Sequence, residues 1–209
     1  MEDCRTETSS SNRSYQTFWF SVTGPAFTTM SLKEITKDLH HEAETTKFAR
    51  LLLSGKIGSK DYANYLYQLL LIYNVIELGN RVEGNFKNLP GLERTHAIYR
   101  DFIEIAGVDH TYEWSPGTME YYDYLLSLVR DPRERPRIKA HLYCRHMGDL
   151  HGGQIIKKQV SHISKGRFYD FNNPESLKIA IRSELTDDLG DEARAAFQWA
   201  IKMLKELYT

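Results

Sequence analysis

Residues 143–158 read YCRHMGDLHGGQIIKK, and three glycines, Gly148, Gly152 and Gly153, fall within six positions of this stretch. The surrounding residues favour one long helix, in which each interior glycine costs about 1 kcal/mol relative to alanine. Gly148 and Gly152 are four residues apart, so they share one face of that helix. A face without Cβ atoms permits a close helix–helix crossing, a kink, or contact between the backbone and a large flat ligand. The sequence leaves these interpretations open.

Two charged residues accompany the glycines. Asp149 directly follows Gly148, and Arg145 precedes Asp149 by one helical turn. On an exposed face this spacing predicts an ordinary intrahelical ion pair. If the glycine face is instead the wall of a ligand site, the Asp149 carboxylate is placed to hold water and to relay protons in a confined space.

A candidate metal ligand, His40, lies beside the apolar stripe of the first predicted helix. Thr36 and Glu44 lie one turn before it and one turn after it. A neutral imidazole is a good iron ligand, and a carboxylate four residues later can bind the second ring nitrogen and fix the tautomer. Simple packing is the common alternative for such a histidine. The adjacent His41 points about 100° away and is the weaker candidate.

The sequence also indicates which kind of metal group this histidine would bind. Neither HExxH nor CxxC occurs, so no zinc-binding spacing is found. A single protein ligand favours a metal that brings its own equatorial ligands, as haem does. Cations would bind the two propionates of haem. Lys33 and Lys37 flank His40, and Lys178 and Arg182 form a basic pair one turn apart. Solvated helix faces are the alternative for both pairs.

Helix signals dominate the chain from Ser31 onward. Ser31 and Glu34 form a capping-box pattern at the start of a helix that we expect to continue to Gly55. No stretch alternates with a period of two, so we expect no sheet. Further helices are expected at about 59–81 and 92–106, after Pro116, in a long segment after Pro132 that ends near Lys165, after Pro174, and in a last helix ending near Tyr208. The prediction is a single all-α domain of about seven or eight helices.

Composition excludes several classes of protein. The 209 residues contain 27 Lys and Arg and 28 Asp and Glu, and this balance excludes a strongly basic nucleic-acid binder. Basic residues are nevertheless concentrated in residues 130–139. This patch either docks an acidic partner or is ordinary solvated surface. No apolar run approaches about 18 residues, so we expect no membrane-spanning helix. Two cysteines, Cys4 and Cys144, make no disulfide framework, and this favours a reducing compartment.

Residues 1–30 differ in composition from the rest of the chain. They are rich in Ser and Thr and lack periodic pattern, so we expect a disordered extension or a misassigned start. A transit peptide is the alternative, although Glu2, Asp3 and Glu7 disfavour it. The domain is therefore expected at residues 31–209, and the protein in the cytoplasm, or in a plastid if the extension is a transit segment.

Two stretches together resemble the haem oxygenase family. Residues 148–154, GDLHGGQ, followed by Lys157 and Lys158, resemble the distal-helix signature of that family. Residues 33–44, KEITKDLHHEAE, resemble its proximal helix, and the separation between the two stretches is also similar. The resemblance implies an all-α, single-domain bundle in which haem lies between the proximal and distal helices.

The resemblance also implies roles for individual residues. His40 would be the axial ligand of the haem iron, with Thr36 and Glu44 beside it. Asp149 would organise the distal water network that supplies protons, and Arg145 and Gly148 would belong to the same catalytic region. The remaining cofactor-binding residues would be Gly152 and Gly153 against the macrocycle, Tyr143 and Phe197 in the pocket, and Lys33, Lys178 and Arg182 at the propionates.

The reaction implied is the oxidative opening of haem at the α-meso carbon to biliverdin, with release of CO and ferrous iron. It uses O2 and reducing equivalents, and haem is both substrate and prosthetic group. The chain ends at Thr209 without an apolar tail, so it resembles the members that have no membrane anchor. Such members are similar to enzymes that take electrons from ferredoxin, an acidic partner for which residues 130–139 or the Lys157–Lys158 region would be docking surfaces.

Two histidines depart from the family pattern. His151 stands where serine is common, and His146 stands where an aromatic residue is common. Imidazoles titrate near pH 7, so either could alter proton delivery or compete for iron, although His151 is expected to point partly away. Three hypotheses follow: an active haem oxygenase, a haem-binding or sensing protein without turnover, and a helical scaffold whose glycines serve only packing.

Overall fold

The computed structural model describes residues 31–87, 89–108 and 111–208; the expected extension at residues 1–30, with Cys4, lies outside them. Within the described ranges every regular element is helical, which confirms the all-α class. The α-helices are α1 (Leu32–Ile35), α2 (Lys37–Thr45), α3 (Lys47–Ser54), α4 (Ser59–Glu83), α5 (Thr95–Ala106), α6 (Pro116–Arg130), α7 (Ile138–Val160), α8 (Pro174–Ser183) and α9 (Gly190–Glu206). Short 3₁₀ helices are η1 (Arg135–Arg137), η2 (Arg167–Tyr169) and η3 (Asp187–Leu189).

The N-terminal segment of the domain is three helices where the sequence predicted one. The capping box is present, because Ser31 N donates to Glu34 Oε2 at 2.9 Å and Ser31 Oγ accepts from Glu34 N. The first break falls at Thr36, whose Oγ1 donates to Leu32 O at 2.8 Å. The second falls at Thr46, whose hydroxyl accepts from Ala49 N and caps α3. Threonine hydroxyls offer the backbone such alternatives to a continuous helix.

The long helix α4 packs against α5, α6 and α7. The helix was expected at about residues 59–81, and it continues through Gly79 to Glu83. A Cβ at Gly79 would lie 2.7 Å from Val129 Cγ2 and 2.9 Å from Ile138 Cγ1. This glycine therefore permits α4 to pack closely against the segment that enters α7. No helix in the described part of the chain is long and apolar enough to cross a membrane.

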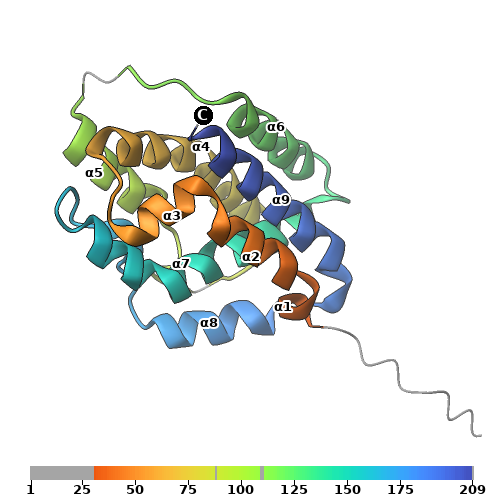
Figure 1. The fold of residues 1–209 in the computed structure, drawn as a ribbon. Helices are drawn as coiled ribbons and strands as arrows, with labels where there is room; N and C mark the ends of the chain where they lie inside the picture. The colour runs from red at the N-terminus through yellow and green to blue at the C-terminus, as the bar shows by residue number, and fades with distance from the viewer. Residues whose placement is uncertain (1–30, 88, 109–110, 209) are drawn as a thin grey trace, which may run out of the picture.

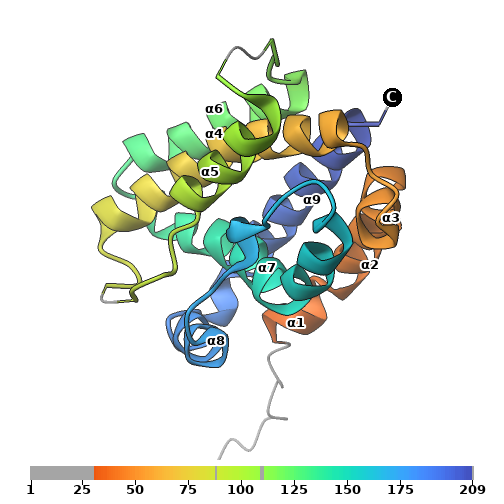
Figure 2. The ribbon, with the colours of Figure 1, turned by 90° about the vertical axis from the view of Figure 1, so that its left-hand side faces the viewer.

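Helix α7 passes through the middle of the molecule and stays helical across its three glycines. It ends at Val160, earlier than the predicted boundary near Lys165. Figure 2 shows α4, α5 and α6 on one side of α7, α8 on the opposite side, and α1, α2 and α3 beside it. In Figure 1, α2 and α3 lie in front of α7, next to α9. This arrangement brings the residues around His40 to the glycine face of α7.

A buried polar network joins α6, α7 and α9. The His141 imidazole on α7 binds Tyr121 Oη through Nδ1 at 2.8 Å and Glu192 Oε1 through Nε2 at 2.6 Å. Glu192 Oε1 also accepts from Tyr124 Oη at 2.8 Å, and Arg137 pairs with Glu192 Oε2. His141 and Glu192 are almost completely buried, so each needs the other as a hydrogen-bond partner. The network therefore ties α7 to both α6 and α9.

We expect Glu192→Ala to lower the free energy of unfolding by about 1–3 kcal/mol, because the buried His141 Nε2 and Tyr124 hydroxyl lose their acceptor. Urea denaturation measures the change. The matched control is Glu120→Ala, which removes an exposed carboxylate that pairs with Lys202 on α9. That substitution is expected to cost less than about 1 kcal/mol. Equal effects of the two substitutions would contradict a structural role for the network.

Candidate functional site

A pocket of about 510 Å³ lies where α2 faces α7, and α8 and α9 close its sides. Nine of the thirteen residues predicted for the site line it, and five further residues join them. The lining residues are Lys33, Thr36, Lys37, His40, Glu44, Tyr143, Cys144, Met147, Gly148, His151, Gly152, Ile155, Arg182 and Phe197. The other four predicted residues, Arg145, Asp149, Gly153 and Lys178, lie outside this lining. The fold therefore unites two stretches of chain that are more than a hundred residues apart.

His40 presents a half-exposed imidazole to this pocket. Its Nδ1 lies 3.5 Å from Glu44 Oε1, one turn later on α2. Its ring meets Phe197 edge-on, with the ring centroids 5.8 Å apart. These two contacts orient the ring and engage Nδ1, so Nε2 is the nitrogen that remains for a ligand. The adjacent His41 lines a different, shallow depression with Arg194, as the helical offset predicted.

The glycines on α7 have two different surroundings. A Cβ added to Gly148 or Gly152 would meet nothing within 4 Å, because these positions face the open pocket. A Cβ added to Gly153 would lie 2.6 Å from Tyr169 Cδ1. The expectation that Gly153 lies against the same ligand is therefore not met, since it packs against η2. Close packing accounts for one glycine, and Gly148 and Gly152 leave backbone open to a ligand.

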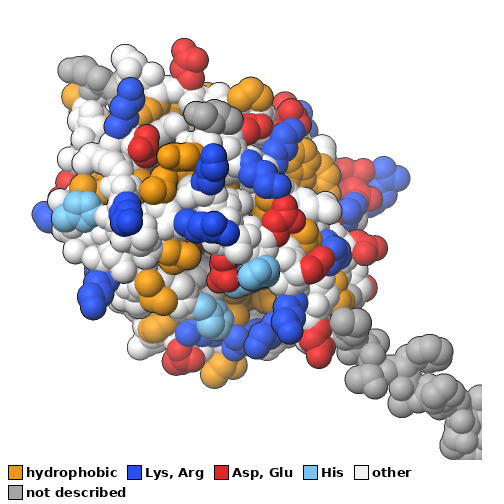
Figure 3. All heavy atoms as spheres, viewed as in Figure 1, with side chains coloured by type: hydrophobic (Ala, Val, Ile, Leu, Met, Phe, Trp, Pro, Cys, Tyr) orange, Lys and Arg blue, Asp and Glu red, His pale blue; other side chains and the backbone are white. Residues whose placement is uncertain are grey.

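Cations lie at the rim of the pocket. Lys33 and Lys37 approach it from the segment that carries His40, and Arg182 approaches it from α8. Lys178 was expected beside Arg182, but its Nζ binds Glu175 Oε1 at 2.7 Å outside the lining. The contact with Glu175, one turn earlier on α8, accounts for the absence of Lys178 from the pocket lining. Figure 3 shows the surface of this side of the molecule, where Lys and Arg side chains lie over α1 and α8 and histidines lie nearby.

Asp149 lies behind the glycine face and turns toward α4. Its Oδ2 accepts a hydrogen bond of 2.5 Å from Tyr73 Oη. Burial raises the pKa of Asp149 to about 7, although the Tyr73 hydrogen bond and the positive charge of Arg145 act in the opposite direction. This carboxyl group can therefore hold or release a proton near neutral pH. Tyr73 is not among the residues predicted for the site from sequence; the signal was a tyrosine hydroxyl in an apolar helix, which needs a partner when it is buried.

Arg145 is not paired directly with Asp149, as the i, i+4 spacing had allowed. Its guanidinium lies over the Tyr121 ring, 5.5 Å from the centroid. Nε and Nη2 are buried and have no hydrogen-bond partner among the described residues. Buried guanidinium N–H groups are costly unless they are bonded. Ordered water is the usual partner for such groups, so the region behind the glycine face is suited to hold water.

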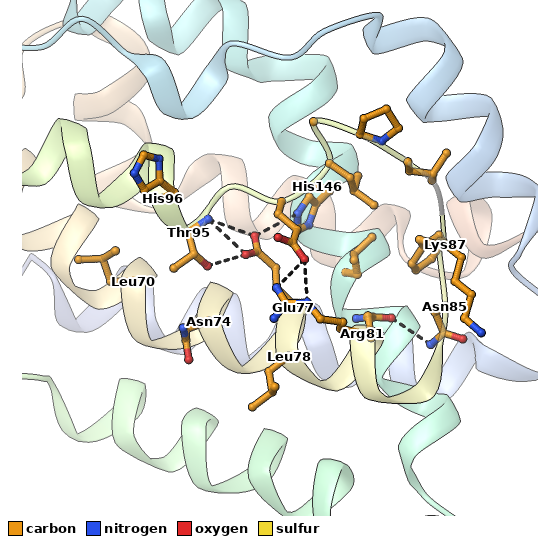
Figure 4. A pocket seen from close by; sticks show the side chains of 18 of the residues that line it. Leu70, Asn74, Glu77, Leu78, Arg81, Asn85, Lys87, Thr95, His96 and His146 are labelled. Carbon is orange, nitrogen blue, oxygen red and sulfur yellow. Dashed lines mark hydrogen bonds and ion pairs between the residues drawn. The ribbon is translucent and has the colours of Figure 1, made fainter.

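His146 faces away from the pocket, because it lies two residues from Gly148 and about 200° around the helix. It lies at a larger hollow of about 1270 Å³ between α4 and α5 (Figure 4). Its Nε2 is 3.8 Å from Glu77 Oε1, and Glu77 accepts hydrogen bonds from Arg94 N and Thr95 Oγ1. Burial lowers the pKa of His146 to about 3. The expectation that it titrates near pH 7 is therefore wrong.

His151 lines the pocket although it was expected to point partly away. Its Nδ1 lies 2.7 Å from Met147 O, and its Nε2 lies 3.3 Å from Arg182 Nη2. The imidazole thus joins α7 to α8 at the pocket rim. Because Nε2 is directed at Arg182, it is not free to compete for a metal in the middle of the pocket.

Known proteins are similar to this chain in sequence and in the arrangement of their helices. The family model for heme oxygenase matches residues 27–206. The heme oxygenase of Porphyra purpurea is 28% identical in an alignment of 201 positions, and the match covers 84% of each chain. Heme oxygenase 1 of Synechocystis sp. is 27% identical in an alignment of 203 positions, and the match covers 84% of this chain and 82% of that one. The crystal structure of heme oxygenase-1 from the cyanobacterium Synechocystis sp. PCC6803 in complex with heme matches with a TM-score of 0.73 and 25% identity, covering 85% of this chain and 90% of that chain.

The matched residues include both faces of the pocket, from Lys33 and His40 to Gly148, Arg182 and Phe197. The similarity extends over most of each chain, and the helical fold agrees with it. The chain therefore belongs to the heme oxygenase family.

Proposed function

We propose that this protein binds haem between α2 and α7 and cleaves it oxidatively. One observation carries the proposal: an imidazole and a helix face without Cβ atoms line the same pocket, with cations at its rim. His40 supplies the imidazole, and Gly148 and Gly152 supply the face. A flat macrocycle with one axial protein ligand and two carboxylates fits these features. The proposed domain that performs this reaction spans residues 31–209.

Each lining residue has a distinct part in binding. His40 would ligate the iron through Nε2, while Glu44 holds Nδ1 and Phe197 limits rotation of the ring. Gly148 and Gly152 would let the macrocycle approach the backbone of α7. Arg182 and Lys33 would bind the propionates, Thr36 would hold the turn between α1 and α2, and Tyr143 would close the pocket at α7.

Asp149 would manage protons behind the macrocycle. Its pKa of about 7 allows both protonation states at neutral pH, and Tyr73 holds one of its oxygens. The buried N–H groups of Arg145 would anchor water next to it. When bound, haem supplies the redox-active iron and is itself the carbon skeleton that is oxidised. The protein would orient that skeleton, deliver protons through Asp149 and its water, and exclude bulk solvent.

The proposed products are biliverdin, CO and ferrous iron, formed from haem and O2. Cations at the pocket rim would favour oxidation at the α-meso carbon, because that bridge lies opposite the two propionates that Arg182 and Lys33 would bind.

An acidic electron donor such as ferredoxin is the proposed redox partner. The basic stretch at residues 130–139 is partly neutralised, since Arg133 pairs with Asp131, and Arg137 pairs with Glu134 and Glu192. Lys157 likewise pairs with Asp170. The rim cations Lys33, Lys37 and Arg182 lie at the pocket itself, so an acidic donor that docks on them would lie next to the bound haem.

Haem binding without turnover is the second candidate function. It would require a second axial ligand or the loss of proton supply. His151 is the histidine that lines the pocket from the α7 side. Its Nε2 is held by Arg182 and its Nδ1 by Met147 O, which disfavours iron ligation by His151. Bilin formation from the haem complex, with reductant and catalase present, decides between the two functions.

We expect His40→Ala to weaken haem binding and to change the absorption spectrum of the ferric complex, because the axial ligand is removed. His41→Ala is the matched control, since it removes the adjacent imidazole, which lines another depression. Titration of the protein with ferric haem, followed at the Soret band, measures both effects. Unchanged affinity and spectrum in His40→Ala would favour a scaffold that does not use this pocket.

We expect Gly148→Ala to stabilise the ligand-free protein by up to about 1 kcal/mol, because alanine is the better helix former. The same methyl group would occupy ligand space and weaken haem binding about tenfold or more. Gly153→Ala is the control, and it should destabilise the free protein by about 1–3 kcal/mol, because the methyl group meets Tyr169. Thermal unfolding and haem titration measure the two quantities. Tight haem binding by Gly148→Ala would remove the glycine face from the site.

We expect Asp149→Ala to bind haem but to form bilin about 10²–10⁴-fold more slowly, as loss of a general acid–base group predicts. In Tyr73→Phe the carboxyl group stays, and its pKa rises above about 7, because the lost hydrogen bond had lowered it. Any limb of the pH–rate profile that follows Asp149 should then move to higher pH. Stopped-flow absorption over a pH series provides the measurement. A normal rate of bilin formation in Asp149→Ala would exclude Asp149 from proton delivery.

A further inference from the structure

The hollow between α4 and α5 is a second cavity, separate from the pocket that His40 lines. Its volume is about 1270 Å³, against about 510 Å³ for that pocket, and the two have no lining residue in common. Ligand sites in proteins have mainly apolar walls and a few polar groups that orient the ligand. Leu78 and Tyr99 line this hollow and are 42% and 51% exposed. The hollow therefore offers room and apolar surface to a large ligand.

His146 lies at the floor of this hollow. It is completely buried, and neither ring nitrogen has a hydrogen-bond partner among the described residues. Burial lowers its pKa to about 3, so the imidazole is neutral and one of its nitrogens carries a lone pair. The backbone carbonyl groups of Leu142 and Leu92 act on its pKa in the opposite direction, and Glu77 Oε1 lies 3.8 Å from Nε2. These neighbours are acceptors, so the lone pair lacks a donor.

The donors at this floor are committed to other acceptors. Arg94 N and the Thr95 hydroxyl donate to the two oxygens of Glu77, at 2.5 Å and 2.6 Å. The guanidinium of Arg94 donates to three backbone carbonyl oxygens. The side-chain amide of Asn80 donates to Ile76 O at 2.8 Å. The missing donor must therefore come from ordered water or from the N–H or O–H of a ligand.

Basic side chains lie on both sides of this floor. Figure 4 shows Lys87 toward one end of the hollow and His96 toward the other, with His146 between them. Lys87 and His96 are both exposed. Arg81 lines the hollow as well, but its Nη2 donates to Glu93 Oε1 at 2.6 Å. Lys87 is therefore a permanent cation that is placed to bind an anionic group of a ligand at the rim.

The product of the proposed reaction carries the groups that these residues would bind. When a meso carbon of haem leaves as CO, each terminal ring keeps a carbonyl oxygen beside its N–H, so both ends of the bilin are lactams. A lactam N–H supplies the donor that the lone pair of His146 lacks. The conjugated skeleton is apolar, and the two propionates lie on the edge opposite the opening. A bilin with its opened edge inward would meet His146 at the floor and Lys87 at the rim.

We propose that the hollow between α4 and α5 is a second ligand site, which binds a linear tetrapyrrole through a lactam N–H at His146 and a propionate at Lys87. The proposal rests on the proposed function, because that reaction makes such a molecule. The site holds the bilin outside the haem pocket, so haem and bilin bind at the same time. A bilin at this site does not compete with the next haem.

Titration of the haem-loaded protein with biliverdin tests the proposal. Ferric haem fills the first pocket, and without a reductant it is not cleaved. Bound bilin is followed by its induced circular dichroism in the red region, where it absorbs more strongly than ferric haem. His146→Phe removes both ring nitrogens and keeps an aromatic ring, and Lys87→Gln removes the charge at the rim. Lys60→Gln is the matched control, since it removes an exposed lysine at the start of α4, outside the lining.

We expect one equivalent of biliverdin to bind to the haem-loaded protein and, with the same affinity, to Lys60→Gln. His146→Phe should weaken binding about three- to tenfold, as loss of one buried hydrogen bond predicts. Lys87→Gln should weaken binding of biliverdin about two- to fivefold, as for an exposed ion pair, and should leave binding of the dimethyl ester unchanged.

Absence of binding, or unchanged affinity in His146→Phe, would overturn the inference and leave the lone pair of His146 to ordered water. If His146→Phe does not fold, Lys87→Gln decides, and equal effects on biliverdin and its ester would then contradict the site. Both results are independent of haem cleavage. Failure of the reduced haem complex to form bilin would instead overturn the proposed function, and with it the identification of the ligand as the product of this protein.

Discussion

The structure depends on the packing that keeps α7 helical through three glycines. In isolation these residues would cost the helix about 3 kcal/mol, a large share of the stability of a domain. Buried side chains along α7, among them Leu142 and Leu150, and the hydrogen bonds between His141 and Glu192 offset this cost. The helix is thus held by its neighbours on α4, α6 and α9. Its remaining face is free to lack side chains, and that face becomes one wall of the pocket.

This constraint explains why the two sides of α7 differ. Toward α2, the helix presents backbone at Gly148 and Gly152 to an open pocket with cations at its rim. Toward α4, it presents Asp149 to the hydroxyl of Tyr73 in a setting that raises the pKa of the carboxyl group. The backbone that faces the pocket at Gly148 is therefore one residue along the chain from the carboxyl group that faces α4. Because α7 is anchored by its contacts with other helices, it can place the open backbone and the buried carboxyl group within one turn.

Much of this arrangement was predictable because helical periodicity fixes which residues share a face. The spacing of Gly148 and Gly152, and of Thr36, His40 and Glu44, is local information, and all five residues line the pocket. That the two stretches face each other was predicted from their resemblance to a family, not from helical spacing. The helix boundaries after Ser115 and Asn173 also followed from local signals, since proline opens both helices.

The errors concern partners that are distant in sequence or local hydrogen bonds that compete with the helix. Gly153 packs against Tyr169, and Arg145 lies over Tyr121, because tertiary packing places those rings there. No periodicity in α7 specifies either contact. The burial of His146 against α4 likewise depends on how the helices cross, and it changes a residue expected to titrate near neutrality into one that stays neutral. The breaks at Thr36 and Thr46 come from local hydrogen bonds of their hydroxyls, whereas the apolar stripe continues through both positions and predicts one helix.

Stability and the pKa of Asp149 are coupled through the contact between α4 and α7. Burial is the largest cause of the raised pKa of Asp149, while Tyr73 and Arg145 act against it. If α7 moved away from α4, water would reach the carboxyl group and its pKa would fall toward the usual range of aspartate. The group would then be ionised at neutral pH and would hold no proton to deliver. The packing that offsets the cost of the glycines therefore also sets the protonation of Asp149, so that a substitution that loosens α7 would lower the pKa of this carboxyl group even if every residue of the pocket were kept.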